Sequence, residues 1–332
     1  MLYCIQFNDN NKNKMDKKVK AAFDAINKHA KKDIAVVGSN KIKVEGQSTG
    51  VELLDYAIGC GGYPKGRITE IFGLASSTKT SLCLYGIAQA QREGKVCMFV
   101  DAEFALDFKH AAAMGVDVDN LIVLKPDSGE EVFDTIEQML RDKLVDFIVV
   151  DSIPSLIPVP ELEAEVNKPT MGGQARLVAS GLRRLVPLVS KNDTVLIFIN
   201  QLRKNIMGGT FDPYTKPGGM SLSFYISVSI RLSNMGKLKK GDEILGQQIK
   251  FQMKKNKVGM NNHEGEMRFM FADGFHSELN MVEVATKKGV ILREGNTYMF
   301  GETKLGIGKE KANAALSENP QMLEQVRSQC QL

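Results

Sequence analysis

Residues 66–95 read GRITEIFGLASSTKTSLCLYGIAQAQREGK. The segment GRITEIFG has the apolar and β-branched residues of a buried strand, and the residues after Thr80 have the spacing of a helix. Between them, GLASSTKTS nearly matches the phosphate-binding pattern G-x-x-x-x-G-K-[ST], with Thr78 in place of the second glycine. A loop of small residues between a strand and a helix predicts a phosphate site, because backbone N–H groups at the helix N-terminus face the anion.

Two side chains of this loop carry the expected chemistry. Lys79 would reach the β- and γ-phosphates of a nucleoside triphosphate, and Thr80 would place its hydroxyl on Mg²⁺. An ordinary helix cap rich in serine and threonine is the alternative interpretation of the same residues. The residues that we expect around the nucleotide phosphates are Gly73, Ser76, Ser77, Thr78, Lys79, Thr80 and Ser81.

Three further apolar segments end in residues with polar side chains. VDFIVVDS ends in Asp151, where phosphate-loop proteins hold the carboxylate of the Mg²⁺ shell. KVCMFVDAE ends in Asp101 and Glu103, and a carboxylate there would orient or deprotonate a water molecule. DTVLIFINQ ends in Asn200 and Gln201, whose amides would sense the γ-phosphate without carrying charge. Because parallel strands present their carboxyl ends at one edge of a sheet, these segments and the phosphate loop together predict one nucleotide site.

The order of segments predicts the fold class. Short β-rich runs alternate with amphipathic helical stretches, which indicates an α/β domain with a mostly parallel sheet buried by helices on both faces. Segments 163–176 and 203–221, rich in glycine and polar residues, interrupt this order. The second is long for a loop inside a compact domain, and such a loop is more often functional or disordered than idle. From Phe224 we expect several strands without intervening helices, and the end of the chain predicts a small α+β module with a helix after Asn319-Pro320. A lysine-rich amphipathic helix is expected from Asp16 to about Lys32.

Composition narrows the class of protein. The 332 residues are 43% hydrophobic and 25% charged, as in ordinary globular proteins, and no apolar run approaches the ~18 residues of a membrane span. The start lacks the features of a signal peptide. The 5 cysteines form no C-x-x-C pair, which favours reduced thiols in a cytoplasm over disulfides or a zinc site. The net charge of +4 comes from the lysines before residue 41, for which a solvated face and contact with nucleic acid are both open interpretations.

Longer blocks of sequence resemble a known family. The segments STGVELLDYAIGCGGYPKGRITEIFG, AQREGKVCMFVDAEFALD, GVDVDNLIVLKPDSGEE, VDFIVVDS, LIFINQLR and KANAALSENP occur in the order found in bacterial-type RecA recombinases, from about Asp16 to the end. The resemblance implies an α/β phosphate-loop NTPase core of RecA type with a small N-terminal helical arm and a small α+β C-terminal domain. It also implies an ATPase that polymerises on single-stranded DNA and pairs it with a homologous duplex.

The resemblance assigns roles around ATP. Lys79 and Thr80 take the triphosphate and Mg²⁺, and Asp151 lies in the second shell of the metal. Glu103 takes the role of general base toward the attacking water, and Gln201 is the γ-phosphate switch that reports to the following loop.

Further nucleotide contacts are implied on both sides of a subunit boundary. Asp107 falls where the family contacts adenine, and His110 replaces the usual stacking tyrosine while keeping an aromatic ring. Lys255 and Lys257 match residues that reach the ATP of the neighbouring subunit, in the manner of arginine fingers.

The resemblance also implies that the two glycine-rich loops face DNA. Glycines give backbone N–H groups close access to phosphates, arginines neutralise charge, and apolar side chains enter opened base steps. The implied DNA contacts are Met171, Gly172, Gly173 and Arg176 in the first loop, Arg203, Lys204, Ile206, Gly218 and Gly219 in the second, and Arg183 beyond them.

The expected organisation is an oligomerisation arm over residues 1–40, an ATPase core over 41–275 with DNA loops at about 163–176 and 202–221, and a C-terminal domain over 276–332. The arm would pack on the next subunit of a helical filament. The implied partners are single- and double-stranded DNA and further copies of the chain, with no membrane. The implied location is the cytoplasm with the nucleoid, or a host cytoplasm if the chain is viral.

Three features depart from the family pattern. Thr78 either holds a strained φ above zero or lets the loop relax to φ below zero, where its hydroxyl could donate to a phosphate. Arginines that the family often has after the second loop appear as Ser229, Ser233 and Asn234, and the end SQCQL has no acidic tail. A non-hydrolysing, ATP-gated protein that coats single-stranded DNA is the alternative function. A ring-forming motor on the same core is disfavoured by the arm and the two loops.

Overall fold

Nine strands among the described residues form one sheet, which is the frame of the nucleotide site. The computed structural model describes residues 17–31, 44–165, 172–204, 214–261, 263–276 and 280–330. The strand order is β13-β12-β11-β10-β3-β7-β6-β4-β5. Neighbouring strands from β10 to β5 in this order are parallel, and those from β10 to β13 are antiparallel. The strands are β3 (Arg67–Gly73), β4 (Cys97–Asp101), β5 (Leu121–Leu124), β6 (Phe147–Asp151), β7 (Val195–Gln201), β10 (Val228–Lys240), β11 (Glu243–Asn256), β12 (Glu264–Met270) and β13 (Gly274–Phe275).

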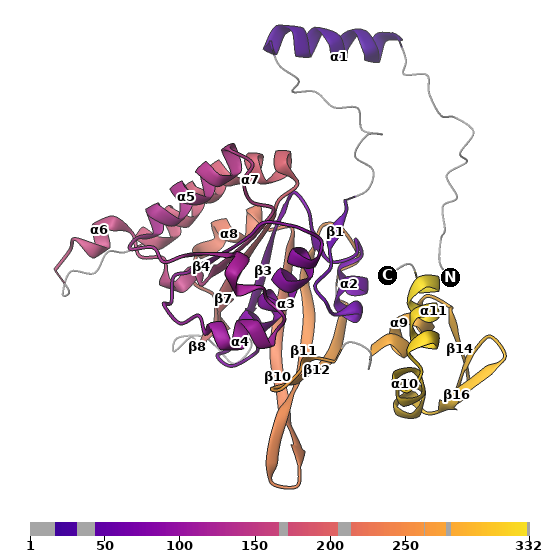
Figure 1. Ribbon diagram of the computed structural model, residues 1–332. Helices are drawn as coiled ribbons and strands as arrows, with labels where there is room; N and C mark the ends of the chain where they lie inside the picture. The colour runs from indigo at the N-terminus through magenta and orange to yellow at the C-terminus, as the bar shows by residue number, and fades with distance from the viewer. Residues whose placement is uncertain are drawn as a thin grey trace. The chain divides into compact units, whose positions relative to one another are not determined.

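Helices cover both faces of the parallel part, as the uninterrupted apolar strands predict. Alternate residues of β6 enter different clusters, Phe147 and Val149 on one face and Ile148 and Val150 on the other. The first cluster includes residues of α2 and α3, and the second includes residues of α5, α7 and α8 (Figure 1). The mostly parallel α/β core is therefore confirmed. The helices of this part are α2 (Glu52–Ile58), α3 (Lys79–Arg92), α4 (Phe108–Ala113), α5 (Gly129–Arg141), α6 (Val159–Leu162), α7 (Gly173–Asn192) and α8 (Gly219–Tyr225), with 3₁₀ turns η3 (Val118–Asn120) and η4 (Ile153–Ser155).

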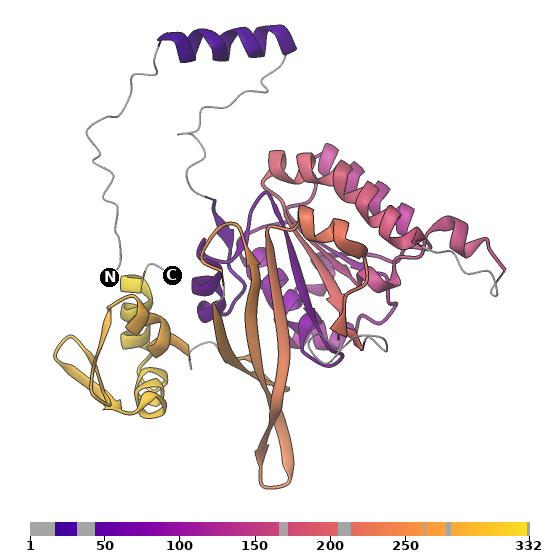
Figure 2. The ribbon, with the colours of Figure 1, turned by 180° about the vertical axis from the view of Figure 1, so that it is seen from behind.

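The expected strand from Phe224 is wrong at its start, because α8 continues to Tyr225 and β10 begins at Val228. The apolar run 224–226 suits a strand, but Leu222 packs into the second cluster and Phe224 is 71% exposed, as on a helix with one buried side. Beyond this point β10 and β11 form a long twisted hairpin that extends past the rest of the sheet, as Figure 2 shows from behind.

Two short strand pairs close loops at the edges of the core. β1 (Gly46–Gln47) pairs with β2 (Tyr63–Pro64), and β8 (Arg203–Lys204) pairs with β9 (Tyr214–Thr215). The second pair joins the start of the segment 203–221 to its residues 214–215.

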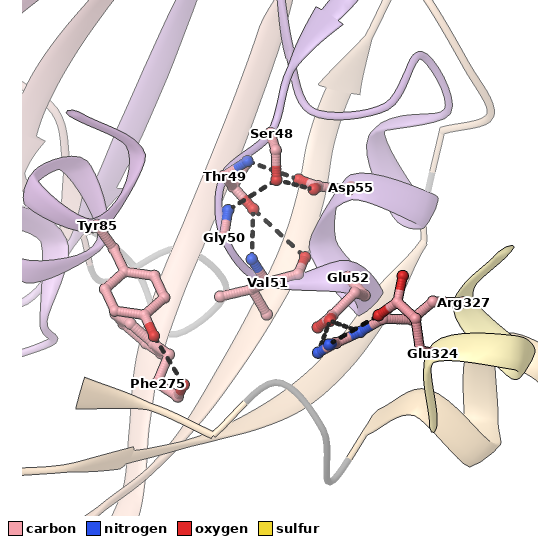
Figure 3. A network of polar contacts seen from close by, with 10 residues as sticks. All are labelled: Ser48, Thr49, Gly50, Val51, Glu52, Asp55, Tyr85, Phe275, Glu324 and Arg327. Atoms are coloured by element: carbon pink, nitrogen blue, oxygen red, sulfur yellow. Dashed lines mark hydrogen bonds and ion pairs between the residues drawn. The ribbon is translucent and has the colours of Figure 1, made fainter. Parts of the chain in front are cut away.

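The C-terminal module has its own antiparallel sheet and its own core. The strands β14 (Ile291–Glu294), β15 (Thr297–Phe300) and β16 (Thr303–Ile307) pack with α9 (Met281–Lys287), α10 (Lys309–Ser317) and α11 (Pro320–Cys330). Arg327 of α11 donates to Glu52 of α2, with Nη2 2.7 Å from Oε1, and this pair connects the module to the core (Figure 3). The small α+β domain is therefore confirmed.

The N-terminal helix α1 (Lys17–Ala30) is a separate unit, and none of its side chains is buried. Among the described residues, no helix is both long and apolar enough to span a membrane.

Candidate functional site

The loop between β3 and α3 has the strained backbone that the missing glycine suggested. Thr78 adopts φ +59° and ψ +23°, in the left-handed region, so the relaxed alternative with φ below zero is wrong. A β-branched residue in this region costs roughly 1–2 kcal/mol. Its hydroxyl donates to the carbonyl of Ser77 at 2.7 Å, within the loop itself. At Gly73 a Cβ would lie 2.4 Å from the carbonyl oxygen of Leu232, so this position requires glycine.

Lys79 begins α3 and is largely buried. Its Nζ donates to the Leu74 carbonyl at 2.8 Å and lies 3.4 Å from the hydroxyl of Ser77. Burial lowers the pKa of Lys79 below its usual value, while the charges of Asp151 and Glu103 oppose this shift. An ammonium group that is poorly hydrated and lies inside the phosphate loop is well suited to pair with phosphate oxygens.

Thr80 and Asp151 meet, although they belong to different elements. The Thr80 hydroxyl donates to Oδ2 of Asp151 at 2.6 Å. Burial raises the pKa of Asp151 to about 6, against the hydrogen bond from Thr80, which lowers it. The described residues contain no cluster of three or more His, Cys, Asp or Glu side chains that could hold a metal. One hydroxyl beside one carboxylate fits Mg²⁺, which keeps waters and phosphate oxygens as most of its ligands.

The polar strand ends lie level with one another at one edge of the sheet. In the strand order, β3, β7, β6 and β4 are consecutive neighbours, with Gly73 paired with Gln201 and Asp101 paired with Asp151. Chain order separates these strands, but the sheet brings their carboxyl ends together.

Glu103 is held by two donors. Its Oε1 accepts a 2.8 Å hydrogen bond from Nε2 of Gln201 and a further one from the hydroxyl of Ser152. The carboxylate of Asp101 has a different role from that of Glu103. It accepts hydrogen bonds from the backbone N–H groups of Ala105 and Leu106 and so stabilises the loop after β4. Sequence reasoning missed Ser152, and the only signal for it was its position directly after Asp151.

The two residues expected at adenine lie at the start of α4. Asp107 is the N-cap of this helix and accepts from the N–H groups of Lys109 and His110. Nε2 of His110 lies 2.9 Å from the hydroxyl of Ser81, the last residue of the predicted phosphate loop. The structure therefore brings His110 next to the first turn of α3.

The exits of the two glycine-rich loops lie side by side. Gly172, with φ +73°, caps α7, and Gly218, with φ +92°, caps α8. A Cβ on Gly219 would lie 3.0 Å from Cβ of Ala175, so glycine permits the close approach of α8 to α7. Gln174, which sequence reasoning missed and no pattern signalled, donates to three carbonyls of the segment 153–156 after β6.

The predicted DNA residues are placed as follows. Arg176 and Arg183 lie on exposed positions of α7, and Arg203 lies exposed on β8. Gly173 is the first residue of α7. Met171, Ile206 and the side chain of Lys204 lie outside the residues that the structure describes. An open cavity of about 500 Å³ connects the two parts of the site, because Glu103, Gln201 and Arg203 all contribute to its wall.

Lys255 and Lys257 lie at the end of β11. Nζ of Lys255 donates to the carbonyl of Ser223 in α8, and the N–H of Lys257 donates to the Ser227 carbonyl. Burial lowers the pKa of Lys255, and the charge of Lys257 lowers it further. In the hydrogen bonds and ion pairs of the described residues, neither side chain reaches the phosphate loop of its own subunit.

These features define a phosphate-loop NTPase fold in which Arg203, at the start of the second glycine-rich segment, lines the same cavity as Glu103 and Gln201. A family model for the RecA N-terminal domain matches residues 17–276, and one for the RecA C-terminal domain matches residues 280–331. Protein RecA of Aquifex aeolicus is 42% identical over 286 residues, which are 86% of this chain and 83% of that protein. Protein RecA of Thermus aquaticus is 43% identical over 289 residues, which are 87% of this chain and 85% of that protein. Protein RecA of Bacteroides thetaiotaomicron is 39% identical over 312 residues, covering 93% and 94% of the two chains.

The chain belongs to the RecA family. It is a RecA-type recombinase and a DNA-dependent ATPase, and the non-hydrolysing alternative is not favoured. ATP as the nucleotide, binding to DNA and assembly into filaments follow from membership of this family.

Proposed function

We propose that this chain polymerises on single-stranded DNA as a helical filament, pairs that strand with homologous duplex DNA and exchanges strands while it hydrolyses ATP. The observation that carries the proposal is the pairing of four polar side chains at the carboxyl edge of the sheet. Thr80 meets Asp151, and Gln201 meets Glu103, within one edge of the sheet. Decay of the phosphate loop would remove selection on these contacts, so their joint presence supports hydrolysis.

The nucleotide would be held by the chain's own groups. Lys79 and the N–H groups from Ser76 to Ser81 would bind the phosphates, with Thr80 on Mg²⁺ and Asp151 behind it. When bound, Mg²⁺ would neutralise phosphate charge. Asp107 and His110 would contact the base.

Glu103 would act as the general base of hydrolysis. The oxygen of a water molecule attacks the γ-phosphorus, its proton passes to the Glu103 carboxylate, and the bond to the bridging oxygen breaks so that ADP leaves. Ser152 and Gln201 fix the carboxylate by hydrogen bonds, which supports a positioned base. Lys255 and Lys257 would stabilise the charge on the ATP of the neighbouring subunit.

The loops and arms would organise the filament. Arg176, Arg183 and Arg203 would neutralise DNA phosphates, and Gly172, Gly173, Gly218 and Gly219 would let the backbone approach them. Met171, Lys204 and Ile206 belong to the same proposed set. Residues 1–40 would be the oligomerisation arm, 41–275 the ATPase core and 276–332 the C-terminal domain. The proposed location is the cytoplasm, with the DNA of the nucleoid.

One experiment tests this proposal. ATP turnover is measured with and without single-stranded DNA, and the assemblies are imaged by electron microscopy. Helical filaments with DNA-stimulated turnover support the proposal. Filaments without turnover indicate a coating protein, and closed rings with turnover indicate a motor.

A further inference from the structure

Glu70 is a buried carboxylate in the middle of the central strand β3. It is 0% exposed, and a buried carboxylate is stable only when its oxygens are paired. Oε1 accepts from Nδ2 of Asn200 at 3.1 Å, on β7. Oε2 accepts from the hydroxyl of Ser229 at 2.6 Å, on β10, and from Nζ of Lys216 at 2.7 Å. Both neighbouring strands thus supply neutral donors, and the cation comes from elsewhere.

That cation, Lys216, belongs to the exit of the second loop. It follows β9 and lies two residues before Gly218, the N-cap of α8. Its ammonium also lies 4.2 Å from the centroid of the Phe72 ring, on the same strand as Glu70. The charge pair therefore attaches the end of a loop to the core of the sheet.

Asn200 connects this ion pair to the nucleotide site. Its Nδ2 also donates to the carbonyl of Pro217 at 3.1 Å, the residue directly after Lys216. Its Oδ1 accepts from the N–H of Gln201 at 2.9 Å, and Gln201 in turn contacts Glu103. A displacement of Gln201 would therefore shift the side chain of Asn200, which donates hydrogen bonds to both Glu70 and Pro217 at the loop exit.

We propose that Glu70 and Lys216 are positioning residues that fix the exit of the second loop to the strand ending in Gln201, and so couple nucleotide binding to DNA binding. The inference rests on the proposed function, in which Gln201 senses the γ-phosphate and the second loop binds DNA. Ser229 stands where the family resemblance implies an arginine. In this chain Ser229 supplies a neutral donor, and the positive charge paired with Glu70 comes from Lys216, which makes the loop exit part of the ion pair.

The charges of Glu70 and Lys216 also act on Lys255. The charge of Glu70 raises its pKa and that of Lys216 lowers it, although burial remains the larger cause of its lowered value. The lysine proposed to act on the neighbouring ATP therefore lies within the electrostatic field of the loop attachment.

The test measures a coupling factor. The affinity of the full-length protein for a labelled oligothymidine is measured with and without a non-hydrolysable ATP analogue, and the factor is the ratio of the two. Lys216→Met should lower this factor about tenfold, whereas Lys216→Arg should retain most of it. Lys250→Met is the matched control, because Lys250 forms a 2.8 Å pair with Glu264 on the adjacent strands and has no contact with the loop exit in the described residues. The Lys250→Met variant should leave the coupling factor unchanged.

A double variant separates positioning from stability. Lys216→Met leaves a buried carboxylate without its cation and should lower the thermal unfolding temperature. Glu70→Gln with Lys216→Met removes that charge and should recover the unfolding temperature but not the coupling factor. Recovery of the factor as well would mean that the pair only stabilises the fold, and the proposal would be overturned.

Two other results would also contradict the coupling role. An unchanged factor in Lys216→Met overturns it directly, and if DNA affinity then falls equally with and without the analogue and the salt slope is smaller, Lys216 is a phosphate contact instead. A wild-type coupling factor near one would overturn the proposed function on which the inference rests. If the wild-type factor is large, the proposed function holds, and a failure seen in the variants then concerns Glu70 and Lys216 alone.

Discussion

The amide of Gln201 donates a 2.8 Å hydrogen bond to Oε1 of Glu103, although the two residues are 98 positions apart in the chain. Gln201 is the last residue of β7 and Glu103 lies just after β4, and these two strands are separated in the sheet only by β6. The group proposed to sense the γ-phosphate and the group proposed to activate water therefore touch. A rotation of the amide away from Glu103 would break this hydrogen bond and leave the carboxylate with the bond from Ser152.

Thr78→Gly should bind ATP as tightly as the wild type, or more tightly by up to roughly five- to thirtyfold, which corresponds to 1–2 kcal/mol. The reason is that Thr78 has φ +59°, a conformation that glycine adopts without strain. Titration of a fluorescent ATP analogue measures the change. Thr78→Ser is the control, because it keeps the hydroxyl that donates to Ser77 and removes only the β-branch. More than tenfold weaker binding by the glycine variant would mean that the threonine hydroxyl is required.

Arg203→Ala and Arg176→Ala should weaken binding to single-stranded DNA of any sequence. Each lost phosphate contact should reduce the slope of log affinity against log salt by roughly 0.7. Arg141→Ala is a suitable control, since its guanidinium is engaged with Glu137 on α5. Equal slopes in all four proteins would exclude these arginines from the DNA backbone.

Lys255→Ala and Lys257→Ala should lose DNA-stimulated turnover while each subunit keeps its ATP affinity. Mixtures of either variant with Lys79→Ala should regain some activity, because one interface in a mixed filament has both the lysines and the phosphate loop. Turnover of mixtures at a range of ratios measures this. If no mixture exceeds the sum of its separate components, the lysines do not act across the subunit boundary.

Asp55 makes folding pH-dependent. Burial raises its pKa from 3.8 to about 7, and the hydrogen bonds from Ser48 and Thr49 only partly oppose this shift. Because the folded protein holds this proton at pH values where the unfolded chain releases it, the contribution to stability is full below pH 3.8 and is lost as pH rises through about 7. Relative to Asp55→Asn, the free energy of unfolding should fall by up to about 4 kcal/mol over this range.

Urea unfolding of both proteins at pH 5 and pH 8 measures the difference. The asparagine keeps an acceptor for the N–H of Thr49 and removes the titration, so subtraction isolates this group from others such as Asp151. Parallel stability changes in the two proteins would show that Asp55 is ionised throughout.

Local sequence was enough to predict the strand, loop and helix around Lys79 and the polar strand ends, because each depends on a few adjacent residues and on the parallel sheet. The start of β10 was misplaced because residues 224–226 have an apolar pattern that suits both a strand and the end of a helix. The φ of Thr78 could not be chosen from sequence, because the hydrogen bond from its hydroxyl to the Ser77 carbonyl in the left-handed conformation was not foreseen. The contacts of Ser152, Gln174 and Lys216 join segments far apart in the chain, and only the packed sheet decides which of them meet.

ATP turnover by Glu103→Gln is the most direct test of the proposed chemistry. The substitution keeps the shape of the side chain and its contacts with Ser152 and Gln201 but removes the proton acceptor. Binding of ATP and DNA should persist, and DNA-stimulated turnover should fall by ~10²–10⁴-fold, the range for loss of a general base. Turnover within about threefold of the wild type would remove Glu103 from that role, since even a modest general base contributes more than this.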